Sequence, residues 1–379
     1  MRHWRPDAME EGDLRVLMRD LAGGGILSED RTEALFSAIM TGALGGVPLA
    51  SILTAMSVRG ETEAELRGAV RAVRSHMLPL AGGDPDAVDV CGTGGDGLGT
   101  LNISTAVAFV LAGMGVPVAK HGNRALSSRA GATDVLSALG IVPDEDFERQ
   151  AYRLREDGLI FMAAPLHHPA MRHAGEVRRA LGFRTLFNLI GPLANPAGVR
   201  RQMVGVFDAR WMDPVARALG GLGSTCVWVV HGDTDMGGSD ELTLAGPGRI
   251  SAWEGGDLRH LAVSADMAGL ASRPIAAIAG GDAAHNARML RDLLAGATGA
   301  YRDTVLLNAA VALHVAGRAN IVVDNAIAPD RLQANVMQAA DAIDSGAALS
   351  ALERATRSLT DIDRSVPVSS FTMQQSGSL

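Results

Sequence analysis

Two short segments rich in glycine and polar residues stand close together in this chain. Residues 92–96 read GTGGD and are followed by NIST at 102–105, and residues 120–124 read KHGNR, followed by Ser127 and Ser128. Glycines remove the Cβ atoms that keep a ligand away from the backbone, so that several N–H groups can converge on a phosphate. Lys120 adds a compact positive charge. The pattern predicts phosphate binding, and two such loops suit a ligand with two separate phosphate groups.

The elements around the two loops support this prediction. Each loop follows a short apolar run that predicts a strand, at 86–90 and at 116–119. Ligands of parallel sheets bind beyond the carboxyl ends of the strands, so both loops should emerge at one edge. Asn102, Ser104 and Thr105 then open an apolar helix, whose free N–H groups and dipole favour an anion. An ordinary tight turn and a solvated loop lysine are the alternatives.

Asp240 and Glu241 are candidate metal ligands. They follow a further predicted strand at 226–230. Adjacent carboxylates at a strand end, with a hydroxyl from Ser104 or Ser239, suit Mg2+ that is bound jointly with substrate phosphates. Plain surface charge is the alternative.

Arg178 is the candidate for holding a carboxylate, because its planar guanidinium can donate to both oxygens at once. It lies in an apolar stretch that also contains His168. The alternative for Arg178 is a position on an exposed helix face, without a ligand. For Arg179 we predict such an exposed position. For His121 a structural role and a substrate contact stay equally open.

The composition limits the classes of protein that the chain can belong to. With 379 residues, 47% hydrophobic residues and a mean hydropathy of +0.14, it can bury a large core. The net charge of -8 argues against a nucleic-acid surface, which needs a basic face. The two cysteines are far apart in the sequence, which argues against a zinc site. Few cysteines and an N-terminus without a signal-like apolar segment predict a cytoplasmic protein. The weakly polar stretch at 105–119 is too short and too interrupted to cross a membrane.

Hydrophobic periodicity predicts an α/β fold in two parts. Residues 13–80 have helical spacing, with an N-cap near Ser28, and residues 81–85 predict a hinge. We expect a small N-terminal helical domain at 1–82, joined in space by about 168–195, and a larger α/β domain at 83–379 with a mainly parallel central sheet. Further strands are predicted at 159–163, 203–207 and, more weakly, 249–253. Further helical segments are predicted at 168–195 with a stop at Gly191 and Pro192, at 282–316 and at 329–356, before a frayed tail at 366–379.

Together these motifs resemble the anthranilate phosphoribosyltransferase family, which joins anthranilate to phosphoribosyl pyrophosphate (PRPP) in tryptophan biosynthesis. The similarity extends over nearly the whole chain and includes TDVL at 133, HHPAM at 167 and RTLFNLIGPLANP at 184–196. It implies the nucleoside phosphorylase/phosphoribosyltransferase type of fold, with the active site in the cleft between the two domains. It also implies Mg2+ as cofactor and a homodimer formed largely through the helical domain, with no nucleic-acid or membrane partner.

The resemblance also implies roles for individual residues. The metal set is Ser104, Asp240 and Glu241. The anthranilate set is Gly92, Asn123 and Arg178, with His121, His168 and Pro192 lining the path. The PRPP set is Gly92, Gly95, Asp96, Thr100, Asn102, Ile103, Ser104, Thr105, Lys120, His121, Gly122, Asn123, Arg124, Ser127 and Ser128.

Two departures from the family pattern stand out. Ala132 replaces a usual serine, which removes one hydroxyl near the PRPP phosphate, and the segment at 233–239 before Asp240 is longer than usual.

The rival functions are a pyrimidine nucleoside phosphorylase, whose Lys-His-Ser-Thr-Gly-Gly type of loop is absent, and a non-catalytic nucleic-acid-binding relative, which the charge of -8 disfavours. The predicted reaction is attack of the anthranilate amine on C1 of the ribose. It requires no strong general base, and His121 is the only weak candidate.

Overall fold

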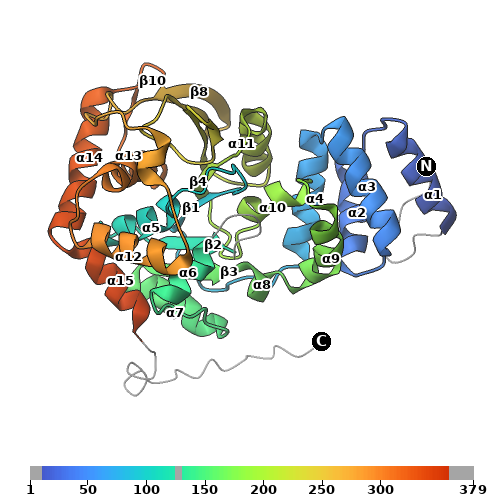
Figure 1. Ribbon diagram of the computed structural model, residues 1–379. Coiled ribbons are helices and arrows are strands. Elements are labelled where there is room, and N and C mark those ends of the chain that lie inside the picture. The colour runs from blue at the N-terminus through green and yellow to red at the C-terminus, as the bar shows by residue number, and fades with distance from the viewer. Residues whose placement is uncertain (1–10, 124–129, 358–379) are drawn as a thin grey trace, which may run out of the picture.

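The computed structural model describes residues 11–123 and 130–357. Arg124, Ser127, Ser128 and the segment at 366–379 lie outside the described residues. A bundle of four N-terminal helices occupies one end of the molecule and a sheet with its flanking helices the other (Figure 1). The bundle consists of α1 (Glu11–Ala22), α2 (Glu29–Met40), α3 (Gly46–Arg59) and α4 (Glu63–Ser75).

Side-chain caps fix where the bundle helices begin. The predicted cap is confirmed: the Ser28 hydroxyl accepts a hydrogen bond from the N–H of Arg31 at the start of α2. Thr62 and the buried Glu65 form a capping box at the start of α4. Gly68 lets α4 approach α2 closely, because a Cβ there would lie 2.9 Å from the backbone nitrogen of Glu33. The bundle is therefore held by local caps and by close helix packing.

The large domain is built on an eight-stranded sheet with the order β3-β2-β1-β4-β5-β7-β8, and β6 pairs with β5. Strands β3, β2, β1, β4 and β5 are parallel, and β6, β7 and β8 add antiparallel pairs. The mainly parallel sheet and the α/β fold class are thus confirmed. The strands are β1 (Val88–Gly92), β2 (Val118–Gly122), β3 (Leu159–Ala163), β4 (Arg201–Gly205), β5 (Cys226–Thr234), β6 (Gly237–Ser239), β7 (Gly248–Glu254) and β8 (Asp257–Val263); a separate pair is β9 (Val322–Val323) with β10 (Ala326–Ile327).

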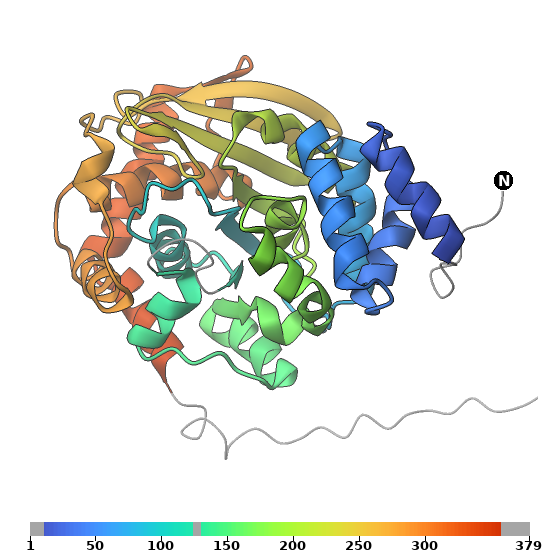
Figure 2. The same cartoon turned by 45° about the vertical axis from the view of Figure 1, so that its right-hand side comes forward.

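Helices cover both faces of the sheet, as the alternating pattern predicted (Figure 2). On one face, α5 packs with α13, α14 and α15; on the other, α10 and α11 join the sheet to α4 of the bundle in one hydrophobic core. The helices are α5 (Ile103–Gly113), α6 (Ala132–Ala138), α7 (Phe147–Asp157), α8 (Ala164–His167), α9 (Arg172–Leu181), α10 (Phe187–Leu193), α11 (Met212–Gly221), α12 (Ala283–Leu294), α13 (Ala300–Val315), α14 (Pro329–Asp344) and α15 (Ala347–Thr356).

Several element boundaries differ from the sequence prediction. Strand β1 ends two residues later than expected, and β2 includes both Lys120 and His121, which were placed in the loop after it. The weak strand at 249–253 is antiparallel and pairs with β8, which the sequence did not reveal. The predicted stop at Gly191 and Pro192 is one residue early: α10 ends at Leu193, with Pro192 inside its last turn.

The segment at 164–193 lies between the bundle and the sheet. Helix α9 contacts α2 and α3, and α10 contacts α4. The Phe187 ring lies 5.2 Å from the ring of Phe36 in the bundle core. This segment therefore packs against the bundle and also contacts the sheet through α8 and α10. No helix of the described residues is long and apolar enough to cross a membrane.

Candidate active site

The glycine-rich loop after β1 has a backbone that requires glycine. Gly94 and Gly95 have φ values of +67° and +79°, a region that residues with a Cβ rarely adopt. Thr93 anchors the start of the loop, since its N–H donates to Gly205 O at 2.9 Å and its hydroxyl accepts from the N–H of Phe207 at 3.1 Å. The loop is therefore held against the end of β4.

The acidic pair lies directly against this loop. The Asp240 carboxylate accepts the Gly94 N–H at 2.7 Å, and the Glu241 carboxylate accepts the Ser104 N–H at 3.0 Å. Neither Gly92 nor Gly205 could carry a Cβ here, because that atom would collide with Asp240. Residues far apart in the sequence thus form one polar site at the carboxyl ends of β1 and β4 and the start of α5.

The longer segment at 233–239 does not displace the acidic pair. Strand β5 continues to Thr234, and β6 returns beside it, with Gly232 paired to Ser239. This hairpin takes up the additional residues. The Ser239 hydroxyl then accepts the Glu241 N–H at 3.2 Å and lies 3.4 Å from the Asp96 carboxylate, so Asp96 joins the same site.

Crowding of these acids changes their protonation. Burial, reinforced by the charges of Asp96 and Glu241, raises the pKa of Asp240 well above its usual range. Burial raises the pKa of Glu241 to about 7, although the charge of Lys120 opposes that rise. A half-buried group of acids of this kind favours a bound cation, which would ionise both members of the pair.

Lys120 and His121 point to opposite faces of β2, because successive side chains in a strand alternate. Lys120 is buried on the face that carries α5, where its ammonium lies 3.1 Å from the Ser104 hydroxyl. His121 lies on the other face, 3.2 Å from Gly191 O. One dipeptide therefore serves two neighbouring sites.

The second site is a cavity of about 370 Å³ between β1, β2 and the segment at 164–194. The six residues assigned to anthranilate by resemblance all line it: Gly92, His121, Asn123, His168, Arg178 and Pro192. Phe187 and Cys91 also line it, and Phe187 contributes an aromatic face below the Arg178 guanidinium, 5.0 Å from the ring centre. Gly92 faces both this cavity and Asp240, so a single residue separates the acidic site from the cavity.

The two histidines of the cavity are uncharged at neutral pH. Burial, helped by the neighbouring His168, lowers the pKa of His121 to about 3, and burial lowers the pKa of His168 to about 4. A carbonyl can only accept, so Nδ1–H of His121 donates to Gly191 O. The buried Nε2 of His121 has no partner within the part of the chain that the structure describes. It is a free acceptor.

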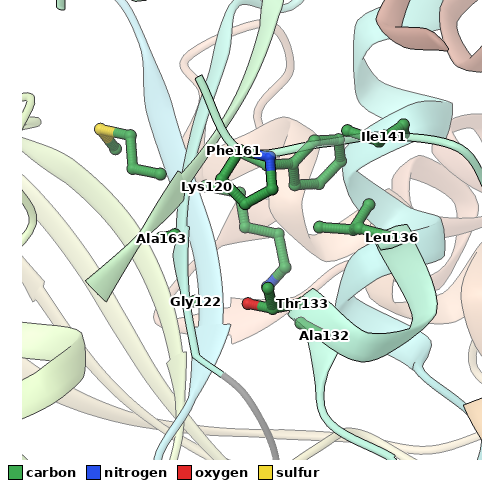
Figure 3. Close-up of a pocket in the computed structure, with 10 residues that line it drawn as sticks. Lys120, Gly122, Ala132, Thr133, Leu136, Ile141, Phe161 and Ala163 are labelled. Carbon is green, nitrogen blue, oxygen red and sulfur yellow. The ribbon is translucent and has the colours of Figure 1, made fainter. Parts of the chain in front are cut away.

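Ala132 lines a much smaller cavity of about 20 Å³, room for about one water molecule. Figure 3 shows it together with Lys120, Gly122, Thr133 and the apolar side chains that close the cavity. A serine hydroxyl at this position would stand beside Gly122, at the end of β2.

The remaining predicted PRPP residues lie along the loop and the first turn of α5. Thr100 forms a bridge with Ala279, and Ile103 and Thr105 are buried. The Asn102 side chain makes no capping hydrogen bond to the helix; it accepts from Asn286, and the Asn102 carbonyl accepts from Tyr301. Asn286 and Tyr301 carry no motif that could have indicated this role, because only the fold brings α12 and α13 to the loop.

The described residues contain no group of three or more His, Cys, Asp or Glu side chains placed to hold a metal. The donor set still fits Mg2+, which commonly takes one or two carboxylates and completes its shell with water and substrate phosphates. Asp240 and Glu241 supply two carboxylates, and the raised pKa of each shows how poorly the pair is neutralised by protein groups alone.

Comparison with known proteins agrees with this geometry. Residues 84–349 match the glycosyl transferase family a/b domain, and residues 15–77 match the helical bundle domain of the same family. An anthranilate phosphoribosyltransferase of Gluconobacter oxydans is 63% identical over 350 residues, which cover 92% of this chain and 96% of that protein. The chain belongs to the anthranilate phosphoribosyltransferase family. A Bradyrhizobium diazoefficiens protein of the same name is 48% identical over 336 residues, covering 89% of this chain and 96% of that protein.

Solved structures of this family have the same fold. The Thermus thermophilus anthranilate phosphoribosyltransferase is 39% identical, with a TM-score of 0.81 over 90% of this chain and 98% of that one. The Saccharomyces cerevisiae enzyme, solved in complex with PRPP and Mg, is 26% identical, with a TM-score of 0.82 over 93% of this chain and 99% of that one. The family resemblance read from the motifs is thereby confirmed.

Proposed function

We propose that this protein transfers the phosphoribosyl group of PRPP to the amine of anthranilate, giving N-(5-phosphoribosyl)anthranilate and pyrophosphate. The observation that supports this most strongly is the pair of adjoining sites separated by Gly92: a polar site made of the glycine-rich loop and the acidic pair, and a partly apolar cavity containing Arg178. Neither rival function accounts for both. A nucleoside phosphorylase has no use for a guanidinium that selects an acceptor carboxylate.

In this proposal the polar site holds PRPP. Lys120 and the backbone N–H groups of the glycine-rich loop and of α5 face the phosphates, with Asn102, Ser104 and Thr105 at the helix start. Mg2+, held by Asp240 and Glu241 with the Ser104 hydroxyl nearby, would supply charge neutralisation for the leaving pyrophosphate. The protein has a net charge of -8, so this neutralisation has to be local. Gly95, Asp96, Thr100 and Gly122 complete the described part of the set.

The cavity receives anthranilate, with its carboxylate on Arg178 and its ring against Phe187 and Pro192. An aromatic amine has a free lone pair at pH 7, so attack on C1 of the ribose needs no strong base. A histidine with a pKa of about 3 cannot hold the released proton in neutral solution. His121 instead serves as a hydrogen-bond acceptor: its free Nε2 can orient the amine N–H and thereby aim the lone pair. Asn123 and His168 line the approach.

Three wider features belong to the same proposal. Rotation of the bundle and the segment at 164–193 about residues 81–85 would close the cleft and exclude water. A homodimer through the helical domain would cover the exposed side chains Val16, Val47 and Val58, which are 59%, 79% and 83% accessible. The free, buried Cys91 and Cys226 suit a reducing cytoplasm.

The test is a mixture of the protein with PRPP, Mg2+ and anthranilate, in which phosphoribosylation is followed by the loss of anthranilate fluorescence. We expect loss that requires both PRPP and Mg2+, with release of one pyrophosphate per acceptor consumed. A folded sample that cleaves a pyrimidine nucleoside with inorganic phosphate, releasing the base and ribose 1-phosphate, and leaves PRPP and anthranilate unchanged would refute the proposal in favour of the phosphorylase.

A further inference from the structure

The side chain of Arg184 reaches from the helical side of the molecule to the glycine-rich loop. Its guanidinium donates a hydrogen bond to Gly95 O and stacks over the Phe207 ring, 4.2 Å from the ring centre. Arg184 is exposed and lies in the turn between α9 and α10. It was not among the residues that the motifs assigned to a ligand.

The backbone of Arg184 is fixed to the bundle. The Ser57 hydroxyl of α3 donates to Arg184 O at 2.9 Å. Three residues later the chain enters the bundle core, where the Phe187 ring packs against Phe36. The position of Arg184 is therefore set by the helical domain, and its guanidinium acts on the other domain.

The loop has little freedom at the point of contact. A Cβ added at Gly95 would lie 3.3 Å from Arg184 Nε, so the guanidinium lies directly on this backbone. Phe207, on which the guanidinium stacks, donates its N–H to the Thr93 hydroxyl at 3.1 Å. Arg184 thus contacts both the loop and the residue that anchors its start.

This contact fixes one peptide of the loop, the one that carries the Gly95 carbonyl. Because the Gly95 carbonyl accepts from Arg184, its hydrogen-bonding requirement is met by the protein itself. On the other side of Gly94, the Gly94 N–H donates to Asp240 at 2.7 Å, so the loop is held by one contact to the acidic pair and one to Arg184. A loop fixed in this orientation does not have to be ordered when a phosphate binds.

We propose that Arg184 is a positioning residue that couples the helical domain to the glycine-rich loop and thereby sets the affinity for PRPP. This inference rests on the proposed function for the identity of the ligand. Arg184 acts through Gly95 rather than by contact with the acceptor, so its loss weakens PRPP binding and leaves anthranilate binding intact.

The test compares Arg184→Ala and Arg184→Lys with two matched controls. Arg179→Ala removes an exposed arginine of α9, and Ser51→Ala removes a hydroxyl of α3 that bonds only within its own helix, to Val47 O. Binding of Mg2+ and PRPP is measured by calorimetry, and KM for each substrate is measured by the fluorescence assay.

We expect Arg184→Ala to raise the Kd and KM for PRPP about tenfold, the effect of losing one charge-assisted hydrogen bond, with the KM for anthranilate within about twofold of wild type. Arg184→Lys should recover only part of this loss, because an ammonium can still donate to the Gly95 carbonyl but lacks the planar group that stacks on Phe207. Ser57→Ala should raise the PRPP constants about threefold, and both controls should match wild type.

Equal PRPP affinity in wild type and Arg184→Ala would overturn the inference, as would an equal rise in KM for both substrates. If Arg184→Ala does not fold, the Ser57→Ala variant decides by the same criteria. A wild-type protein that binds PRPP but leaves anthranilate unchanged would refute the proposed function alone, because the calorimetric comparison still tests the coupling.

Discussion

Replacement of Arg178 by alanine separates acceptor binding from chemistry. The guanidinium lines the cavity over Phe187, and burial lowers its pKa with no described carboxylate acting as a partner. Its donors are therefore available to a ligand. A charge-assisted hydrogen bond contributes about 1.5–3 kcal/mol, and about 1.4 kcal/mol corresponds to a factor of ten. We expect Arg178→Ala to raise the KM for anthranilate about tenfold to a hundredfold.

The turnover number should change little. The carboxylate of anthranilate takes no part in bond formation, so Arg178 holds it equally well before and during the reaction, and such uniform binding affects KM rather than kcat. The assay varies anthranilate at saturating PRPP and Mg2+. Aniline, which lacks the carboxylate, is the matched acceptor, and wild type and Arg178→Ala should use it equally. The exposed Arg179→Ala variant should resemble wild type.

Two results would refute this reasoning. A fall in kcat with an unchanged KM for anthranilate would mean that Arg178 acts on the transition state. An equal rise in the KM for PRPP would mean that the substitution distorts the glycine-rich loop instead of removing a carboxylate contact.

The double variant Asp240→Asn with Glu241→Gln should raise the Mg2+ concentration for half-maximal turnover at least about tenfold. Asp235→Asn, on the exposed β5–β6 turn, is the control and should not change it. An unaltered Mg2+ titration in the double variant would place the metal elsewhere. Ala132→Ser should lower the KM for PRPP roughly two- to tenfold, the effect of one added hydrogen bond of about 0.5–1.5 kcal/mol, and an unchanged KM would show that this position does not reach the phosphate. Burial alone would raise the pKa of Glu254, but hydrogen bonds from His314 and Trp228 lower it to about 2. The ionised Glu254 therefore stabilises the fold fully above pH 4.5, the ordinary pKa, and this contribution is lost as the pH falls from 4.5 toward 2. Denaturant unfolding at pH 6 and pH 3 should therefore show a loss of stability that is about 1–2 kcal/mol larger in wild type than in Glu254→Gln, and equal losses would contradict the argument.

The local sequence was sufficient for the chemistry of the site and for much of the secondary structure. GTGGD and KHGNR combine glycines and a lysine in a way that few structural roles require, and Ser28 marks a helix start through a bond made within three residues. Such features depend on neighbours along the chain, so they can be read without the fold. Strand ends could be read only to within about two residues, because pairing with adjacent strands decides where a strand ends.

The tertiary structure decided which groups meet. Strand alternation places Lys120 beside Ser104 and His121 in the cavity beside Gly191, although the sequence placed both in one loop. The β5–β6 hairpin keeps Asp240 at Gly94 despite the longer segment before it. The contact of Arg184 with Gly95 joins residues that are 89 positions apart. Strand order and helix packing fix these distances, and burial lowers the pKa of His121. Neither the distances nor the burial is a property of a short stretch of sequence.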